Sequence, residues 1–505
     1  FEQVVAQQAE LYPQQLPWLI ARAYWAAGGS FNTAELYAWL FKSMGEDIVA
    51  AKPTPTKQLR WFFDGSIHNQ LDNFKVPKSQ QNSIIALIDH AGGSRPADAK
   101  LLHDLCQQAE KNYSLQCLGA LAYWGEAGVT AAEKLLPFKD QLAAIVMLQD
   151  FVIGGGEGRE SVTATLDQLD VPVIKAIKLR DRTAIERQLS SDGLAQEKVY
   201  YQVAMPELQS ASQPLVIATA GAMGNDSITG IRIQAVAQES SGIESLLSRI
   251  DRWRQLQIKP NSEKRIAIVY YNHPPGRHNI GADNLDVPAS LWQILHQLKA
   301  SGYKVGTLPE SQEALLDMMQ ERGVNLPRDV GELEKMSGLV QLMSAEDYSN
   351  WFAQLPAPVR QEMEQGPFGL LHQQLSSAIA VGKSHLAKDA LDHTLEEMHH
   401  LLEGVDHKGR ERALALLAKL ESCYLAAIQS TDALVCMAQA PSIIDALQST
   451  GIEGLGGWGA APGKVMSYKG ELLLPGLIFG NIFVGPQPPR GWEINEELLH
   501  ANLAF

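Results

Sequence analysis

Side chains that can exchange protons or bind anions are concentrated in one loop, directly after a predicted buried strand. The loop spans residues 272–281 and includes His273, Arg277, His278 and Asn279. Imidazole gains or loses a proton near neutral pH, and guanidinium pairs with carboxylates. Because open α/β sheets bind ligands at the carboxyl ends of their strands, this loop is a candidate ligand site; the alternative is an ordinary connecting turn.

A second chemically distinctive segment lies near the end of the chain, after another predicted strand. It reads QPPRGWE, with Gln487, Arg490 and Glu493, and His500 ends the short predicted helix that follows. An apolar neighbour such as Trp492 raises the pKa of a carboxyl group, which would suit Glu493 to accept a proton near neutral pH. The alternative is that Glu493 only occupies the first turn of that helix.

Two histidines of a predicted helix are a possible metal site. His393 and His400 are seven residues apart and therefore share one helix face, with Glu396 and Glu403 near the same side. Imidazole and carboxylate together can hold a divalent metal. No HExxH motif occurs there, so a solvated polar face with incidental histidines is favoured over a metal site.

Two glycine-containing segments resemble phosphate-binding loops. The run GGGEG at 154–158 follows an apolar strand and could place backbone N–H groups around a phosphate, but it lacks dinucleotide-binding spacing, and a flexible loop is favoured. Gly382, Lys383 and Ser384 copy the end of a P-loop, but Ser377 stands where the first glycine is required. This chain is therefore not expected to bind ATP itself.

Apolar patterning predicts a multidomain α/β protein with parallel-sheet βαβ units, a helical N-terminal region and a helical insertion. One unit runs from a strand at 142 to a strand at 171–177. Another joins a strand at 266–271, a helix at 288–301, Gly302 and a short strand at Val305. The predicted segments are helical 1–136, α/β 137–260, α/β 261–345, a helical insertion 346–432, and strands and turns from 433 to 505 that rejoin the α/β part and look truncated.

Composition excludes several classes of protein. The 505 residues carry 42 Lys and Arg against 57 Asp and Glu, a formal net charge of −15, which is the wrong sign for a nucleic-acid-binding surface. No apolar run approaches the length of a membrane span.

The four cysteines form no CxxC pair, which argues against a disulfide framework or a thiolate zinc site and favours a reducing, cytoplasmic location. Because Phe1 opens the chain without a leader, we expect a processed chain or a piece of a longer one.

Both chemically distinctive segments resemble one family. The run KRIAIVYYNHPPGRHNIGADNLDVPASLWQILHQLKASGYKVGTLP at 264–309 and the run PGLIFGNIFVGPQPPRGWEINEELLH at 475–500 are similar to the large subunit of class I chelatases. These are the cobaltochelatase large subunit and the magnesium-chelatase H subunit. The likeness covers about residues 140–505, and the motifs YYNHPPG and NIGADNL are closer to the cobaltochelatase type.

The resemblance implies a function. Such a subunit binds a tetrapyrrole and a divalent metal, with cobalt favoured here over magnesium or iron, while AAA+ partner subunits hydrolyse ATP. Glu493 matches the family's acidic residue and is implied as the catalytic base, with His500 beside it. Substrate binding is implied for the remaining loop residues: His273, Arg277, His278, Asn279, Gln487 and Arg490.

The chain also departs from the family. Members continue past the point matching Phe505 into a motif of the type GTHGxxEWLPGK, and Pro206 and Glu207 are followed here by LQS rather than Asp-Gly. Three readings stay open: a portion of a chelatase large subunit, a non-catalytic tetrapyrrole-binding module, and a haem dechelatase that runs the reverse reaction.

Overall fold

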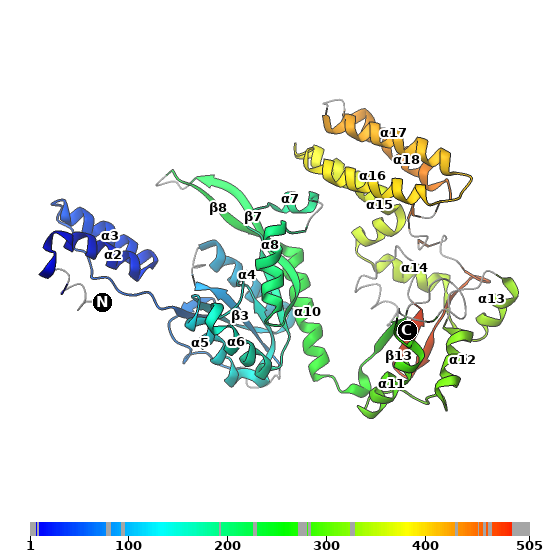
Figure 1. Cartoon of the computed structure of the whole chain (residues 1–505), viewed down its shortest axis with the longest axis horizontal. Coiled ribbons are helices and arrows are strands. Elements are labelled where there is room, and N and C mark those ends of the chain that lie inside the picture. The colour runs from blue at the N-terminus through cyan, green and yellow to red at the C-terminus, as the bar shows by residue number, and fades with distance from the viewer. Residues whose placement is uncertain are drawn as a thin grey trace. The chain divides into compact units, whose positions relative to one another are not determined.

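The computed structural model divides the chain into two compact units, which are described separately. Unit 1 comprises residues 1–180 and 196–254, and unit 2 comprises residues 181–195 and 255–505 (Figure 1). No helix among the described residues has the length and apolarity that crossing a membrane requires. The structure describes residues 7, 10–76, 82–91, 96–190, 193–225, 230–270, 280, 284–323, 329–429, 433–452, 454–457, 461–462 and 467–486.

Unit 1 is built on an eight-stranded sheet in the order β2-β1-β4-β3-β5-β6-β7-β8. The five central strands, from β4 to β7, pair in parallel, and the outer strands pair antiparallel. In chain order the parallel strands therefore read 2-1-3-4-5, a doubly wound arrangement. The strands are β1 (Leu59–Phe63), β2 (Ser66–His68), β3 (Ile84–His90), β4 (Gln116–Ala122), β5 (Leu142–Met147), β6 (Val173–Lys178), β7 (Ala211–Asn225) and β8 (Arg232–Gln238).

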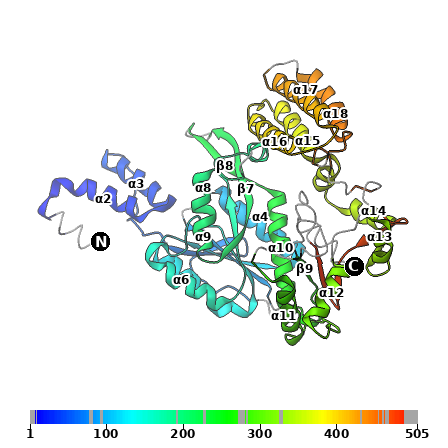
Figure 2. The same ribbon diagram turned by 45° about the vertical axis from the view of Figure 1, so that its right-hand side comes forward.

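Helices cover both faces of this sheet, which explains its uninterrupted apolar strands (Figure 2). Ile84, Ala86 and Ile88 of β3 pack with α5 and α6, whereas Ile85 and Leu87 pack on the opposite face with α4 and α10. The elements of unit 1 outside the sheet are η1 (Pro13–Gln15), α2 (Leu16–Ala27), α3 (Gly29–Ser43), α4 (Pro96–Tyr113), α5 (Glu126–Glu133), η3 (Leu136–Gln141), α6 (Gly155–Leu169), α8 (Gln196–Val199), the π-turn η4 (Tyr200–Ala204), α9 (Met205–Glu207) and α10 (Ser240–Ile258).

The α/β fold and the βαβ unit from β5 through α6 to β6 confirm the sequence analysis. The helical prediction for 1–136 is corrected: strands β1 to β4 lie between 59 and 122. The boundary placed at 136 falls inside unit 1. Runs such as QCLGALA favour helix by residue type, but burial on both faces makes them strands.

Unit 2 contains two small sheets. The first has the order β12-β13-β9, with β13 parallel to β9 and antiparallel to β12. Its core is completed by α11 and α12. The elements here are η5 (Asn261–Glu263), β9 (Ile266–Tyr270), α11 (Val287–Ala300), α12 (Gln312–Arg322), α13 (Val330–Ser337), the antiparallel pair β10 (Gln341–Ser344) and β11 (Glu471–Leu474), α14 (Ala345–Gln354), β12 (Leu477–Phe479) and β13 (Ile482–Pro486).

A helical bundle completes unit 2, in agreement with the helices predicted there. Its members are α15 (Ala357–Ala380), α16 (Leu386–Glu403), α17 (Arg410–Gln429), α18 (Ala433–Gln448) and the short α7 (Ala184–Leu189), which follows β6 in the chain. α15 bends at Gly366, whose φ is 66° and where a Cβ atom would collide with the Gly456 carbonyl oxygen. Only glycine fits this position.

α7 is anchored to the bundle by packing and charge. Leu189 lies in the bundle core, and the Glu186 carboxylate pairs with Lys383. Lys383, together with Thr183 at the helix N-cap, lowers the pKa of Glu186 to about 2. The P-loop-like lysine is therefore part of a structural ion pair at the end of α15.

Two further predictions in unit 2 are corrected. The strands expected from 433 begin only at β11, because α18 occupies 433–448 with Pro441 inside it. No strand forms at Val305; this residue is buried, and the neighbouring Lys304 carbonyl accepts a hydrogen bond from the Asn481 N–H. The predicted β9, α11 and the left-handed Gly302 after the helix are confirmed.

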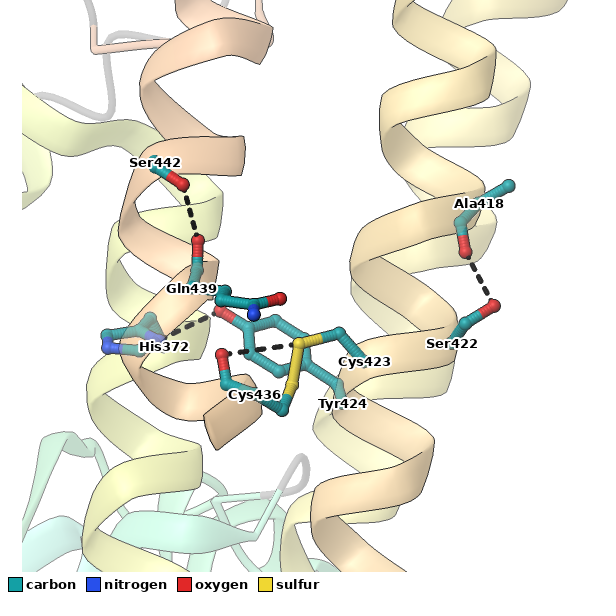
Figure 3. The surroundings of a disulfide bond; sticks show 8 residues. All are labelled: His372, Ala418, Ser422, Cys423, Tyr424, Cys436, Gln439 and Ser442. Carbon is teal, nitrogen blue, oxygen red and sulfur yellow. Dashed lines mark hydrogen bonds between the residues drawn. A yellow bond between two sulfur atoms is a disulfide. The ribbon is translucent and has the colours of Figure 1, made fainter. Parts of the chain in front are cut away.

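The expectation of unpaired cysteines is wrong. Disulfides join Cys106 to Cys117 and Cys423 to Cys436, with Cα atoms 5.6 and 5.4 Å apart. Each pair links consecutive elements, α4 to β4 and α17 to α18. In Figure 3 the second disulfide lies beside the buried Tyr424, whose hydroxyl is 3.0 Å from His372 Nδ1. The prediction of a reducing compartment, which depended on unpaired thiols, loses its basis.

We predict that Cys423→Ser with Cys436→Ser lowers the free energy of unfolding by about 3 kcal/mol, because the bond closes a short loop and restricts the unfolded chain. Urea unfolding of the double variant and of the wild type measures this difference. As a control, titration of the denatured, unreduced wild type should find no free thiol. Four free thiols, or equal unfolding midpoints, would contradict the pairing.

Candidate functional site

The carboxyl ends of β9 and β13 bring the two chemically distinctive segments to one sheet edge. The strands run parallel with Ile482 opposite Ile266 and Pro486 opposite Tyr270. Neighbouring strands lie about 4.8 Å apart. The chain therefore leaves both strands at adjacent points: residues 271–279 follow one strand and residues 487–500 follow the other. Sequence spacing alone could not establish this juxtaposition.

Tyr270, the last residue of β9, is anchored below this edge. It is 5% exposed, and burial raises the pKa of its phenol. Its hydroxyl has no hydrogen-bond partner among the described residues. A Cβ atom at Gly323 would lie 2.5 Å from this hydroxyl oxygen, so the glycine at the end of α12 makes room for the ring. The end of β9, from which the 271–279 segment continues, is thus fixed by packing.

Most of the predicted site residues lie outside the described residues, so their side chains are not placed. They are His273, Arg277, His278, Asn279, Gln487, Arg490, Glu493 and His500. The structure supports their grouping only through the strand ends from which both segments depart.

The two predicted metal-binding histidines lie on the exposed surface of α16. The side chain of His393 is 67% exposed and lies 3.4 Å from Glu397, and that of His400 is 90% exposed and lies 3.9 Å from Glu403. Within the described part of the chain, no group of three histidine, cysteine or acidic residues is arranged to hold a metal ion. Metal binding by this pair stays a prediction.

The glycine run at 154–158 serves close packing between helices. A Cβ atom at Gly128 in α5 would lie 2.7 Å from the Gly154 nitrogen, and one at Gly158 would lie 2.6 Å from Val129. The absence of side chains therefore lets α6 approach α5. This packing accounts for Gly158 of the run and for Gly128 of α5 without a phosphate.

Sequence reasoning missed a cluster of cations at the carboxyl edge of the unit 1 sheet. Lys178 Nζ lies 2.7 and 2.6 Å from the two carboxylate oxygens of Asp89, and both side chains are at most 10% exposed. Arg180 Nη2 lies 2.9 Å from both oxygens of Asp98. These ion pairs tie the end of β6 to β3 and to the first turn of α4.

Lys175 is the most deeply buried member of this cluster. Its side chain is 1% exposed, and Nζ donates to the Gln149 carbonyl at 2.7 Å and lies 3.6 Å from Asp150. Burial lowers the pKa of Lys175 to about 8, and the nearby carboxylate of Asp150 opposes this shift in part. A lysine within the apolar run VPVIKAIK was the available signal.

Comparison with protein families gives the identity. A family model described as CobN/Magnesium Chelatase matches residues 22–385 and 445–504, most of the chain. The chain belongs to the CobN/magnesium chelatase family. The unmatched stretch covers α16, α17 and most of α18, so the chelatase match includes all three described sheets but not most of the helical bundle.

Individual chelatase subunits show the same relationship. The magnesium-chelatase H protein of Rhodobacter capsulatus is 32% identical over 59% of this chain and 26% of its own length. The aerobic cobaltochelatase CobN protein of Pseudomonas aeruginosa is 25% identical over 70% of this chain and 27% of its own length. The chain spans less than a third of these curated relatives.

A solved structure shares the fold. The catalytic subunit of cobaltochelatase from Mycobacterium tuberculosis superimposes with a TM-score of 0.52 and 20% identity, covering 96% of this chain and 32% of that one. The chain therefore shares its fold with about a third of that protein.

The buried Lys175 predicts a specific pH dependence. Between its folded pKa of about 8 and its usual value of 10.5, the unfolded chain holds the proton and the folded chain does not. Stability therefore rises with pH in this window, by about 2 kcal/mol between pH 8 and 10. Lys175→Met should lack this gain, which denaturant unfolding at several pH values measures.

Lys134→Met, at an exposed position of the same sheet unit, is the matched control and should follow the wild-type curve. If the free energy of unfolding changed with pH in the same way for the wild type and Lys175→Met, the folded lysine would be shown to keep its proton.

Proposed function

We propose that this chain is part of the tetrapyrrole-binding large subunit of an ATP-dependent metal chelatase and forms one wall of the site where the metal enters the macrocycle. One observation carries the proposal: the parallel pairing of β9 with β13, which starts both family motifs at adjacent strand ends. Family membership supports it independently.

Metal insertion sets the chemistry that this wall has to supply. A divalent metal replaces two pyrrole N–H protons, so a base must accept protons close to the ring centre. We assign this role to Glu493, with His500 as the neighbouring proton carrier. A carboxylate or imidazole can also hold the metal briefly before it passes to the ring nitrogens.

The remaining motif residues would hold the macrocycle. Arg277 can pair with a carboxylate side chain of the ring through two parallel hydrogen bonds. Binding roles at the ring edge are proposed also for His273, His278, Asn279, Gln487 and Arg490. These residues belong to the two segments that follow β9 and β13, whose ends are adjacent, so one ligand could be shared by both segments.

Cobalt is the proposed metal substrate, because the amino-acid sequence at 270–285 resembles that of the cobaltochelatase type. The relatives include both magnesium-chelatase and cobaltochelatase subunits, so magnesium stays the competing choice. ATP hydrolysis is assigned to AAA+ partner subunits.

Glu493→Gln should lower cobalt insertion by the assembled chelatase at least ~100-fold, because the amide cannot accept a proton. Porphyrin binding, followed by quenching of tryptophan fluorescence, should change little because the side-chain shape is kept. Insertion is measured from the absorbance change of the tetrapyrrole with partner subunits and ATP present.

Glu496→Gln, three residues further along the same segment, is the matched control and should retain activity. Full activity of Glu493→Gln would remove the base from the mechanism, and equal loss in both variants would point to a structural effect.

A further inference from the structure

The carboxyl edge of the unit 1 sheet carries a continuous row of aromatic rings. The aromatic row is defined as His90, Trp124, Phe151, Tyr201 and Tyr200. Successive ring centroids along it are 5.6, 5.8, 5.8 and 5.0 Å apart. We propose that this row binds a tetrapyrrole, with one ring stacked on the face of the macrocycle and the neighbouring rings at its edge, as a second site separate from the β9–β13 edge; the choice of ligand rests on the proposed function.

The row occupies the place where the strand order reverses. β3 lies between β4 and β5, and the connections that leave β3 and β5 run toward opposite edges of the sheet. Open α/β sheets bind ligands in the crevice outside such strand ends. His90 ends β3, Trp124 follows β4 and Phe151 follows β5, so three connections contribute rings at this point.

The backbone beneath the row is held in uncommon conformations. Phe151 has a φ of 66°, a region that aromatic residues rarely occupy, and its N–H donates to the Tyr201 carbonyl at 2.7 Å. Tyr200 and Tyr201 begin the π-turn η4. Strained residues and π-turns recur at functional sites. The hydrogen bond joins the backbones of two separate connections.

Three rings of the row remain accessible. Trp124 is 50% exposed, and Tyr200 and Tyr201 are each 52% exposed. The planes of successive rings in the row are inclined by 43–88°, so a flat conjugated ligand can stack on one exposed ring and meet the neighbouring rings at its edge. A run of several adjacent rings exceeds what a single nucleobase covers and suits a macrocycle.

Charge at the same edge suits a ligand with peripheral carboxylates. Arg180 is 41% exposed and, among the described residues, bonds Asp98 only through Nη2. Its remaining N–H groups can donate to a carboxylate of the ligand. Lys178 is only 10% exposed and is paired with Asp89, so the more exposed Arg180 is the cation proposed to contact the ligand.

The test is a titration of the full chain with deuteroporphyrin IX, followed by the Soret absorbance. The wild type should bind two porphyrins. Trp124→Ala with Tyr201→Ala should weaken one site at least ~10-fold and leave the other unchanged. His273→Ala with Arg277→Ala should weaken the other site instead. The site at the aromatic row and the site at the β9–β13 edge are therefore tested independently, so either can be refuted without the other.

Two controls separate stacking at the row from other effects. Trp25→Ala removes a 78% exposed tryptophan of α2 and should leave both sites intact, which excludes general porphyrin adsorption. Tyr201→Phe keeps the ring and should bind normally. If the alanine pair does not fold, Trp124→Leu with Tyr201→Leu removes the ring faces while keeping apolar volume.

Unchanged binding by the row variants would overturn this inference and leave the proposed function standing. Wild-type binding of a single porphyrin that only the His273 and Arg277 variant weakens would also overturn it. Saturable binding of flavin mononucleotide at the row, without porphyrin binding there, would show that a smaller ring is the ligand and would likewise refute it.

Discussion

The parallel pairing of β9 with β13 is the constraint on which the organisation of unit 2 depends. The chain leaves the sheet after Tyr270, builds helices α11 to α14, a small antiparallel pair and a bundle, and then returns beside its starting strand. Closing so long a loop costs little more than closing a moderately long one, because the entropic cost grows slowly with length. The bundle has its own core and disulfide, so it can vary without disturbing the strand pair. The family match, which omits 386–444 and retains both strands, agrees with this division.

The sequence predicted those elements whose local pattern and tertiary environment agree. The β5–α6–β6 unit, β9 and α11 have apolar strands, an amphipathic helix and glycine at the expected turn. Prediction from the sequence failed where burial overrides the secondary-structure preference of the residues. β4 consists largely of alanine, leucine and glycine and becomes a strand because helices cover both faces. The residues of α18 were predicted to begin the strands and turns from 433 on, yet they form a bundle helix with Pro441 inside it.

For the candidate site, too, only some features could be predicted from the sequence. Motif residues could be recognised by type, and the structure adds that their segments start at neighbouring strand ends. The cations Lys175, Lys178 and Arg180 could not be grouped from the sequence, because their partners come from β3, α4 and the end of β5. The disulfides escaped notice for a related reason: their cysteines are 11 and 13 residues apart and meet only when consecutive elements fold back on each other.

The placement of α7 in the bundle gives the chain an unusual connectivity. The polypeptide passes from unit 1 to unit 2 after Arg180, returns before Gln196, and crosses again after Arg254. After a break at the crossing that follows Arg254, the units would stay linked only through α7, which packing and the Glu186–Lys383 ion pair hold in the bundle. The outgoing crossing continues directly from β6, and the returning one leads into η4. A force applied to the bundle would therefore act first on the ends of these two elements. Mechanically, three strands of polypeptide share a load that a single interdomain linker would carry alone.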